Sequence, residues 1–312
     1  MNITTKDLPT ALTEVLFARL VPMITGNPGI GKSDIVKQVA NKLNLQLIDV
    51  RLSQMDSSDI NGFPTIKDGK TIFVPPDIFP ITTDPLPKGK DGWLVFLDEL
   101  SSASLSTQAA AYKLILDKQV GQYHLHPNVA IVAAGNKSTD KAIVNRMGTA
   151  MQSRLVHFNL DVSHKDWIDW ALVNNIHHSI ISFIEFRPTL LHNFNPNHVD
   201  NTFACPRTWS FVNSIIKDKQ KLSTLDTAII AGCIGEGPAR EFKGYTDIFE
   251  SLPKLTDIVK SPTTCQLTER PDVLYATSGL IAHNINKDNI ESLAKGIISP
   301  IIKSQIIKEW MH

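Results

Sequence analysis

Cysteine is scarce in this chain, and neither sign of charge is in excess. The three cysteines among 312 residues lie far apart and form no C-x-x-C pair, which argues against a disulfide framework and against a cysteine zinc site. Lys and Arg number 31, as do Asp and Glu, so no overall field favours nucleic acid or an anionic membrane. A local basic groove is compatible with this balance. We expect Cys205, Cys233 and Cys265 to be reduced thiols.

Long hydrophobic runs are also missing. No apolar stretch approaches the ~20 residues that a membrane-spanning helix needs, and the first residues lack the apolar centre of a signal peptide. We therefore expect no membrane partner and a cytoplasmic location. The content of 42% hydrophobic and 20% charged residues is typical of a globular protein. The length suggests about two domains.

One motif that is present organises the rest of the chain. The segment before it, 20–25, is apolar and predicts a buried strand, and the segment after it, 34–43, has the apolar spacing of a helix. This is the setting in which G-x-x-x-x-G-K-[ST] binds phosphate, and it argues against a chance match in a glycine-bearing turn. The motif is complete, as Gly26, Asn27, Pro28, Gly29, Ile30, Gly31, Lys32 and Ser33.

Each residue type in this loop has a chemical reason. Gly26, Gly29 and Gly31 allow the backbone to curl so that successive N–H groups face one anion, at the positive end of the following helix. We expect Lys32 to contact the β- and γ-phosphates, and the Ser33 hydroxyl to bind Mg²⁺. The predicted ligands are therefore ATP and Mg²⁺.

Two carboxylates follow the most apolar strand-length segment, Trp93 to Leu97. Such a segment predicts a strand buried on both faces of a parallel sheet, whose carboxyl end points at the ligand crevice. Asp98 is then placed to hold Mg²⁺ through water, and Glu99 to polarise a water against the γ-phosphate. The alternative, an acidic helix cap after a core strand, is disfavoured by the intact phosphate loop.

A further strand, Val129 to Gly135, ends in Asn136, which could orient the attacking water. The alternative for Asn136 is an ordinary turn residue. Arginines are usually solvated surface groups, so Arg146 and Arg154 matter only if the nucleotide of a neighbouring subunit lies beside them.

The remaining pattern predicts a helix over 4–19 capped by Thr4 or Thr5, a strand over 45–52, a turn over 56–64 and a hairpin around Asp68-Gly69. Beyond residue 160 the alternation of strands and helices stops, and helices dominate. We therefore expect an α/β P-loop domain, a parallel sheet flanked by helices, over 1–160, an all-α lid over 161–250 and a helical extension over 251–312.

Together these motifs resemble the AAA+ ATPases, and within them the MoxR-type branch, over roughly residues 15 to 240. The phosphate loop is similar to Walker A, 94–99 to Walker B, and Asn136 to sensor 1. The segment 59–64 with the hairpin and 73–76 resembles that branch's insert in the second helix. Cys205-Pro206-Arg207 is similar to the sensor-2 motif, and 148–154 to the segment of the arginine finger.

The resemblance implies a homo-oligomeric ring, usually of six subunits, with ATP at each subunit boundary. Arg154, or Arg146, would complete the neighbour's site, and Arg207 would act from the lid. MoxR-type ATPases often work with a protein bearing a von Willebrand A domain, so the implied client is a protein and the implied role is chaperone-like remodelling of that partner or metal insertion into it. The last 60 or so residues match no known motif.

Two other functions stay open from the sequence. A basic, aromatic-bearing pore loop would favour a nucleic-acid motor or loader of the same fold. The hairpin contains Lys67, Lys70 and Phe73, which does not decide between this function and protein remodelling. The even charge balance does not favour this alternative. A nucleotide-switched binding module with negligible turnover is the other, and intact Glu99, Asn136 and Arg207 argue against it.

Overall fold

The computed structural model of the chain describes residues 2–137, 145, 147–197, 200–219 and 221–250. The chain divides into two compact units. The first ends at Ser163 but also includes the short segment 195–197, and the second comprises the other described residues from His164 on. The extension predicted over 251–312 lies outside the described residues. Each unit has its own hydrophobic core, and each is described by itself.

The first unit is built on a six-stranded sheet in which every described pair of neighbouring strands is parallel. The strand that leads into the phosphate loop lies inside this sheet, with another strand on each side. Parallel strands end at one edge of a sheet, so the segments that follow them meet there. The spatial order is β1 (Asn2–Ile3), β10 (Leu155–Leu160), β2 (Val21–Thr25), β9 (Val129–Gly135), β6 (Gly92–Asp98) and β3 (Leu45–Arg51).

Strand β6 is buried along its whole length. Its side chains alternate between two apolar clusters, with Val95 and Leu97 on one face of the sheet and Leu94 and Phe96 on the other. A strand that is buried on both faces needs helices above and below it. The prediction made from its continuous apolar run is thus confirmed.

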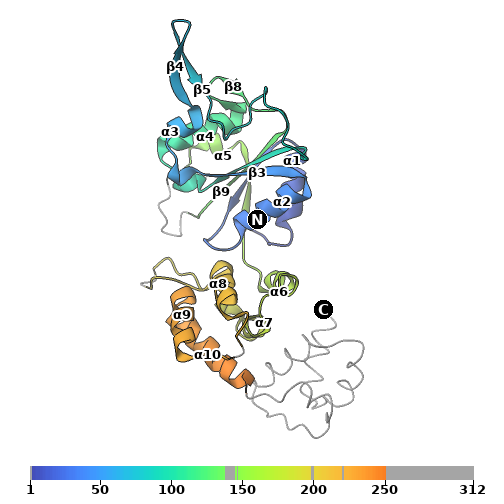
Figure 1. Cartoon of the computed structure of the whole chain (residues 1–312), viewed down its shortest axis with the longest axis vertical. Helices are drawn as coiled ribbons and strands as arrows, with labels where there is room; N and C mark the ends of the chain where they lie inside the picture. Colours follow the sequence, from blue (N-terminus) through green and yellow to red (C-terminus); the bar gives the residue numbers. More distant parts are fainter. Residues whose placement is uncertain (1, 138–144, 146, 198–199, 220, 251–312) are drawn as a thin grey trace. The chain divides into compact units, whose positions relative to one another are not determined.

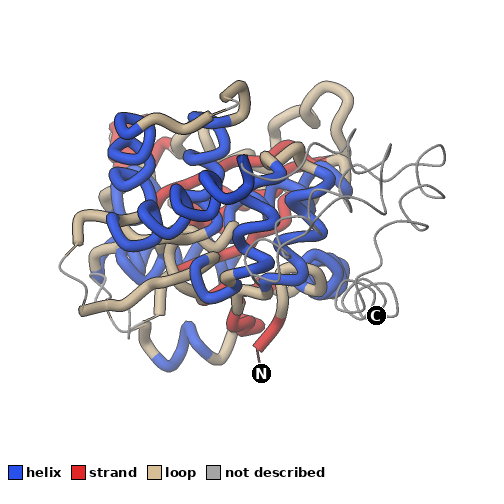
Figure 2. The backbone as a smooth tube through the Cα atoms, turned by 90° about the horizontal axis from the view of Figure 1, so that it is seen from below, coloured by secondary structure: helices blue, strands red, loops and turns tan. Residues whose placement is uncertain are grey.

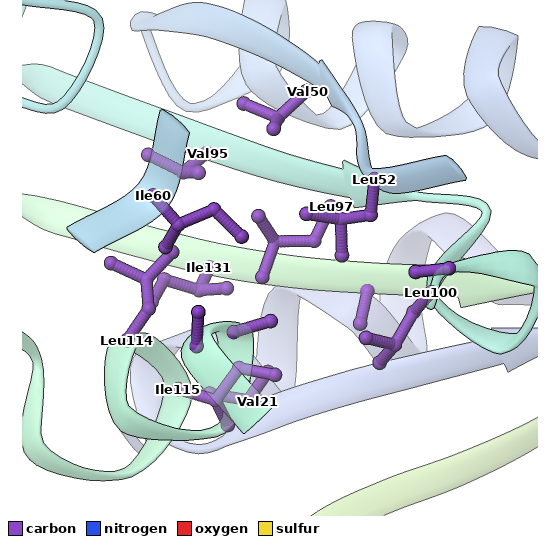
Figure 3. Close-up of a cluster of buried hydrophobic side chains, with 14 of the residues drawn as sticks. Val21, Val50, Leu52, Ile60, Val95, Leu97, Leu100, Leu114, Ile115 and Ile131 are labelled. Atoms are coloured by element: carbon purple, nitrogen blue, oxygen red, sulfur yellow. The ribbon is translucent and has the colours of Figure 1, made fainter. Parts of the chain in front are cut away.

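Helices flank both faces of this sheet, whose strands are red in Figure 2. The Leu94 face is covered by α1 (Leu8–Phe17) and α2 (Lys32–Lys42), and the Val95 face by α3 (Ser57–Asn61), α4 (Leu105–Asp117) and α5 (Thr149–Gln152). Figure 3 shows Val95 and Leu97 packed together with Ile60 of α3 and Leu114 of α4. The predicted α/β sheet flanked by helices is confirmed.

Two N-terminal expectations are wrong in detail. Helix α1 begins at Leu8, with Asp7 as its first flanking residue, so neither Thr4 nor Thr5 is the cap. The Thr4 hydroxyl instead accepts from the Asp7 N–H at 3.4 Å, in a turn before the helix. Residues 2 and 3 lie extended, because β1 adds to the edge of the sheet beside β10. The helix ends before Arg19, whose φ of 57° is left-handed.

The turn predicted over 56–64 contains a short helix, α3. Asp56 and Asp59 form a capping box at its start, and the Asp56 N–H donates to the Asp59 carboxylate at 2.8 Å. The expected hairpin follows, as β4 (Phe63–Lys67) and β5 (Lys70–Val74). Asp68 and Gly69 at its tip have φ of 50° and 73°, and a two-residue type I′ turn requires positive φ at both positions. Figure 1 shows the hairpin projecting from the body of the first unit.

Short elements complete the first unit around the sheet. They connect the ends of β3 and β6 to the helices and form a small two-stranded sheet. They are η1 (Leu52–Gln54), η2 (Leu100–Ser102), β7 (Gln119–Val120) and β8 (Tyr123–His124).

The described part of the second unit is helical, as expected for a lid. An aromatic cluster fills its core, in which the Phe183 ring lies 5.7 Å from Trp209, 5.2 Å from Phe242 and 5.4 Å from Tyr245, centroid to centroid. None of the described helices is long and apolar enough to cross a membrane. The elements are α6 (His164–Val173), α7 (His178–Phe186), η4 (Pro188–Leu190), α8 (Pro206–Ile216), α9 (Thr224–Ile234) and α10 (Glu236–Glu250).

Candidate nucleotide site

The phosphate loop connects the end of β2 to the start of α2. Gly29 and Gly31 have φ of 75° and 92°, a left-handed conformation that glycine adopts at little cost. Gly26 is required for a different reason, since a Cβ there would lie 2.7 Å from Ile30 Cδ1 and 3.0 Å from the Leu160 carbonyl oxygen. Asn27, Pro28 and Ile30 occupy the remaining positions of the loop. Its geometry is that of an anion-binding turn at a helix N-terminus.

Lys32 begins α2 and folds back over the loop. Its Nζ donates to the carbonyl oxygens of Gly26 and Asn27, at 2.6 and 2.9 Å. The same Nζ donates to Asn136 Oδ1 at 3.2 Å. The structure thus brings together two residues that the sequence analysis placed in one site from separate strand ends.

Ser33 and Asp98 also meet at this edge of the sheet. The Ser33 hydroxyl donates to Asp98 Oδ2 at 3.2 Å, and Asp98 is buried at the end of β6. A hydroxyl beside a carboxylate is the oxygen donor set that Mg²⁺ prefers. The two residues therefore suit the binding of one Mg²⁺ ion, as in the P-loop proteins, and water and phosphate would supply the other ligands.

Glu99 follows Asp98 in an uncommon backbone conformation. Its φ of 59° is left-handed, which is rare outside glycine and often marks functional sites. The Glu99 N–H donates to Asp98 Oδ1 at 2.8 Å, and this bond fixes the turn. The Glu99 carboxylate accepts a hydrogen bond from the Ser53 hydroxyl.

Arg51 is a part of this cluster that the sequence analysis missed, as is Ser53. The Arg51 guanidinium lies 3.9 Å from Asp98 Oδ2 and 3.8 Å from Glu99 Oε1, and it pairs with Asp49 at 3.3 Å. The signal was strand register, because Arg51 is opposite Asp98 in the β3–β6 ladder. Predicting which strands are neighbours would have placed this cation beside the two carboxylates.

The three predicted arginines are in different situations. Arg154 is exposed, donates from Nη1 to the Ala150 carbonyl at 2.7 Å, and lies over the Tyr112 ring at 5.7 Å. Arg207 is exposed in the first turn of α8, in the second unit. Arg146 lies outside the described residues.

Shifted pKa values occur at some distance along the chain from the phosphate loop. Burial lowers the pKa of Lys118, at the end of α4, to about 8. Hydrogen bonds from Lys219 and then from Ser223 lower the pKa of Asp226 to about 2, whereas burial raises the pKa of the Cys233 thiol. Among the described residues no three His, Cys, Asp or Glu side chains gather as a metal site.

The sequence from residue 22 to residue 155 matches the model of a family described as AAA domain, dynein-related subfamily. A comparison with curated proteins gives no match. Among solved structures, a candidate ATPase from Cytophaga hutchinsonii is 12% identical, with a TM-score of 0.40 over 95% of this chain and 82% of that one. A mutant of RuvB from Thermotoga maritima is 14% identical, with a TM-score of 0.44 over 93% of this chain and 85% of that one.

The structural similarities are too distant to inform on reaction or partner. The family match is different, because it spans the phosphate loop, both strand-end carboxylates and Asn136. It confirms the AAA+ part of the resemblance, whereas the match names the dynein-related subfamily and not the MoxR branch. Residues 22–155 therefore match the AAA domain model, and the first unit has the fold of the AAA+ P-loop nucleoside triphosphatases.

Proposed function

We propose that this chain is an ATP hydrolase of the MoxR-type branch, and that it couples hydrolysis to remodelling of a protein partner. One observation carries the catalytic part of this proposal. At the carboxyl edge of the parallel sheet Lys32 is hydrogen-bonded to Asn136 and Ser33 to Asp98, with Glu99 next to Asp98. These are the groups needed to bind a triphosphate and to activate water against it.

Binding belongs to the loop and to Lys32. The N–H groups of the turn and the ammonium of Lys32 would hold the β- and γ-phosphates, in exchange for the carbonyl contacts that Lys32 makes now. Ser33 and Asp98 would hold Mg²⁺. The ion, when bound, neutralises charge that develops on the phosphate oxygens.

Water activation belongs to Glu99 and Asn136. Glu99 would accept the proton of the attacking water, while the Asn136 carboxamide would orient that water. The Glu99 carboxylate is now bonded to Ser53. Hydrolysis would therefore require this carboxylate to exchange its serine partner for water.

Assembly and partner form the second part of the proposal. A homo-oligomeric ring, taken as a hexamer, would let Arg154 or Arg146 of one subunit complete the site of the next, with Arg207 acting as sensor 2. The free thiols of Cys205 and Cys233 suit the cytoplasm. A protein with a von Willebrand A domain is the partner that the MoxR resemblance suggests.

The test is ATP turnover by the purified chain and by Glu99→Gln. The amide keeps the shape of the side chain but cannot accept a proton, so ATP should bind with little change while turnover falls by about 10²-fold or more. Equal rates in the two proteins would refute the role of Glu99. Turnover that rises strongly with added DNA would favour the nucleic-acid motor, and no turnover in the parent would favour the nucleotide-switched module.

A further inference from the structure

Ser101 is a buried side chain that the catalytic proposal does not use. It lies in η2, directly after β6, and is 7% exposed. Its hydroxyl accepts from the Asn136 N–H at 3.0 Å and donates to the Asn136 carbonyl at 3.3 Å. One hydroxyl therefore bonds both main-chain polar groups of the residue whose side chain contacts Lys32.

This contact depends on a close approach of the two segments. A Cβ at position 135 would lie 2.5 Å from Ser101 Oγ and 3.1 Å from Ser101 Cβ. Any other residue at the end of β9 would therefore push the serine away. Gly135 is consequently explained by the Ser101 contact, because its backbone is not in the left-handed conformation.

The turn that contains Ser101 is also hydrogen-bonded to Asn145. The Ser101 carbonyl accepts from the Asn145 N–H at 2.8 Å, and Asn145 Nδ2 donates to the Ala103 carbonyl at 2.8 Å. Positions 136 and 145 are thus both bonded to the segment that follows Glu99. A shift of this segment would move Asn136 with it.

We infer that Ser101 is the positioning residue for Asn136, and that it ties the water-orienting carboxamide to the turn that carries Glu99. The inference rests on the proposed hydrolysis, and Ser101 acts through Asn136 without touching the nucleotide. Without the hydroxyl, the Asn136 N–H and carbonyl each lose a hydrogen-bond partner. The Asn136 carboxamide is then no longer held in position beside Lys32. Turnover depends on that placement, whereas the phosphate loop binds ATP through its own backbone.

The test compares Ser101→Ala with the parent in turnover and in ATP affinity. Loss of both hydrogen bonds displaces the carboxamide, and we expect a kcat lower by about tenfold, with ATP Kd within about twofold of the parent. In an Asn136→Ala background the same substitution should lower kcat no further, because the group that Ser101 positions is gone. Gly135→Ala, which displaces the hydroxyl, should repeat the loss of kcat in the parent background.

The matched control is Ser182→Ala, which removes an equally buried serine hydroxyl bonded to the His178 carbonyl in α7. It should leave kcat at the parent value. If Ser101→Ala does not fold, Ser101→Cys, which keeps only a weak donor, should show the lowered kcat. Parental kcat in these variants, or losses that add to Asn136→Ala, would overturn the inference. A parent that does not hydrolyse ATP refutes the proposed function instead.

Discussion

At the scale of single residues, Lys32 links the phosphate loop to Asn136, at the end of the neighbouring strand β9. Its ammonium satisfies two loop carbonyls and Asn136, and phosphate oxygens would be stronger, charged acceptors. We predict that Lys32→Ala weakens ATP affinity at least about tenfold, since charge-assisted hydrogen bonds contribute ~1.5–3 kcal/mol. Isothermal titration calorimetry measures this directly.

Lys37→Ala is the matched control, because Lys37 is an exposed lysine of the same helix. It should bind ATP like the parent. An unchanged affinity of Lys32→Ala would show that nucleotide binds elsewhere.

Asp226 allows a prediction of pH dependence. Lys219 and the Ser223 cap lower its pKa from 3.8 to about 2, so its carboxylate stabilises the fold above pH 4, and this contribution is lost as the pH falls towards 2. Asp226→Asn should therefore lower Tm at pH 7 and make little difference near pH 2. Melting curves of both proteins across this range provide the measurement.

The exposed residue Asp169, substituted as Asp169→Asn, is the control and should shift Tm little at either pH. A Tm difference for Asp226→Asn that is the same at pH 7 and pH 2 would contradict the pKa assignment. NMR titration of the Asp226 carboxyl carbon gives the value independently.

The residues of the nucleotide site could be predicted from the sequence because strand ends define them. Lys32, Asp98 and Asn136 each follow an apolar run, and the parallel sheet brings these ends together. Arg51 and Ser53 could not be found in the same way, because their role depends on which strand neighbours β6. Hydrophobic pattern locates strands, but pairing is a tertiary property.

At the scale of elements, long periodic segments were predictable and short ones were not. Strands β6 and β9 and helix α2 follow their sequence patterns closely. Helix α3 was missed because its five residues are too few to show helical periodicity and Gly62-Phe63-Pro64 follows at once. Its capping box, Asp56 and Asp59, was the available signal.

Helix α3 and the hairpin after it contain two isoleucines in opposite environments, which yields a prediction for this element. Ile60 is 1% exposed in the core cluster, whereas Ile66 in β4 is 80% exposed. Ile60→Ala should lower the free energy of unfolding by about 2–5 kcal/mol, and Ile66→Ala by less than ~0.5 kcal/mol. Urea unfolding of the two variants measures both values.

Equal destabilisation by the two substitutions would contradict the placement of Ile60 in the core and of Ile66 outside it. Phe63 and Ile66 are both exposed on the projecting hairpin, so their side chains add little to the packing of the core.

At the scale of the whole molecule, the proposed ring would complete each site with an arginine from a neighbouring subunit. The described contacts of Arg154 are with Ala150 and Tyr112, and neither belongs to the phosphate loop. Lys32 is hydrogen-bonded to Asn136, and no described arginine other than Arg51 approaches the carboxylates of Asp98 and Glu99. An arginine from a second subunit would supply the missing positive charge and could raise the rate by about 10³–10⁵.

This proposal predicts that two inactive variants restore each other when mixed. Arg154→Ala keeps an intact phosphate loop but lacks the finger, whereas Lys32→Ala lacks the loop contact but keeps the finger. Mixed rings should hydrolyse ATP at the boundaries where an intact loop meets an intact arginine, and each variant alone should not. Recovery with Arg146→Ala in place of Arg154→Ala would assign the finger to Arg146. No recovery in either mixture, with mixing verified by mass spectrometry of the intact assemblies, would exclude completion between subunits.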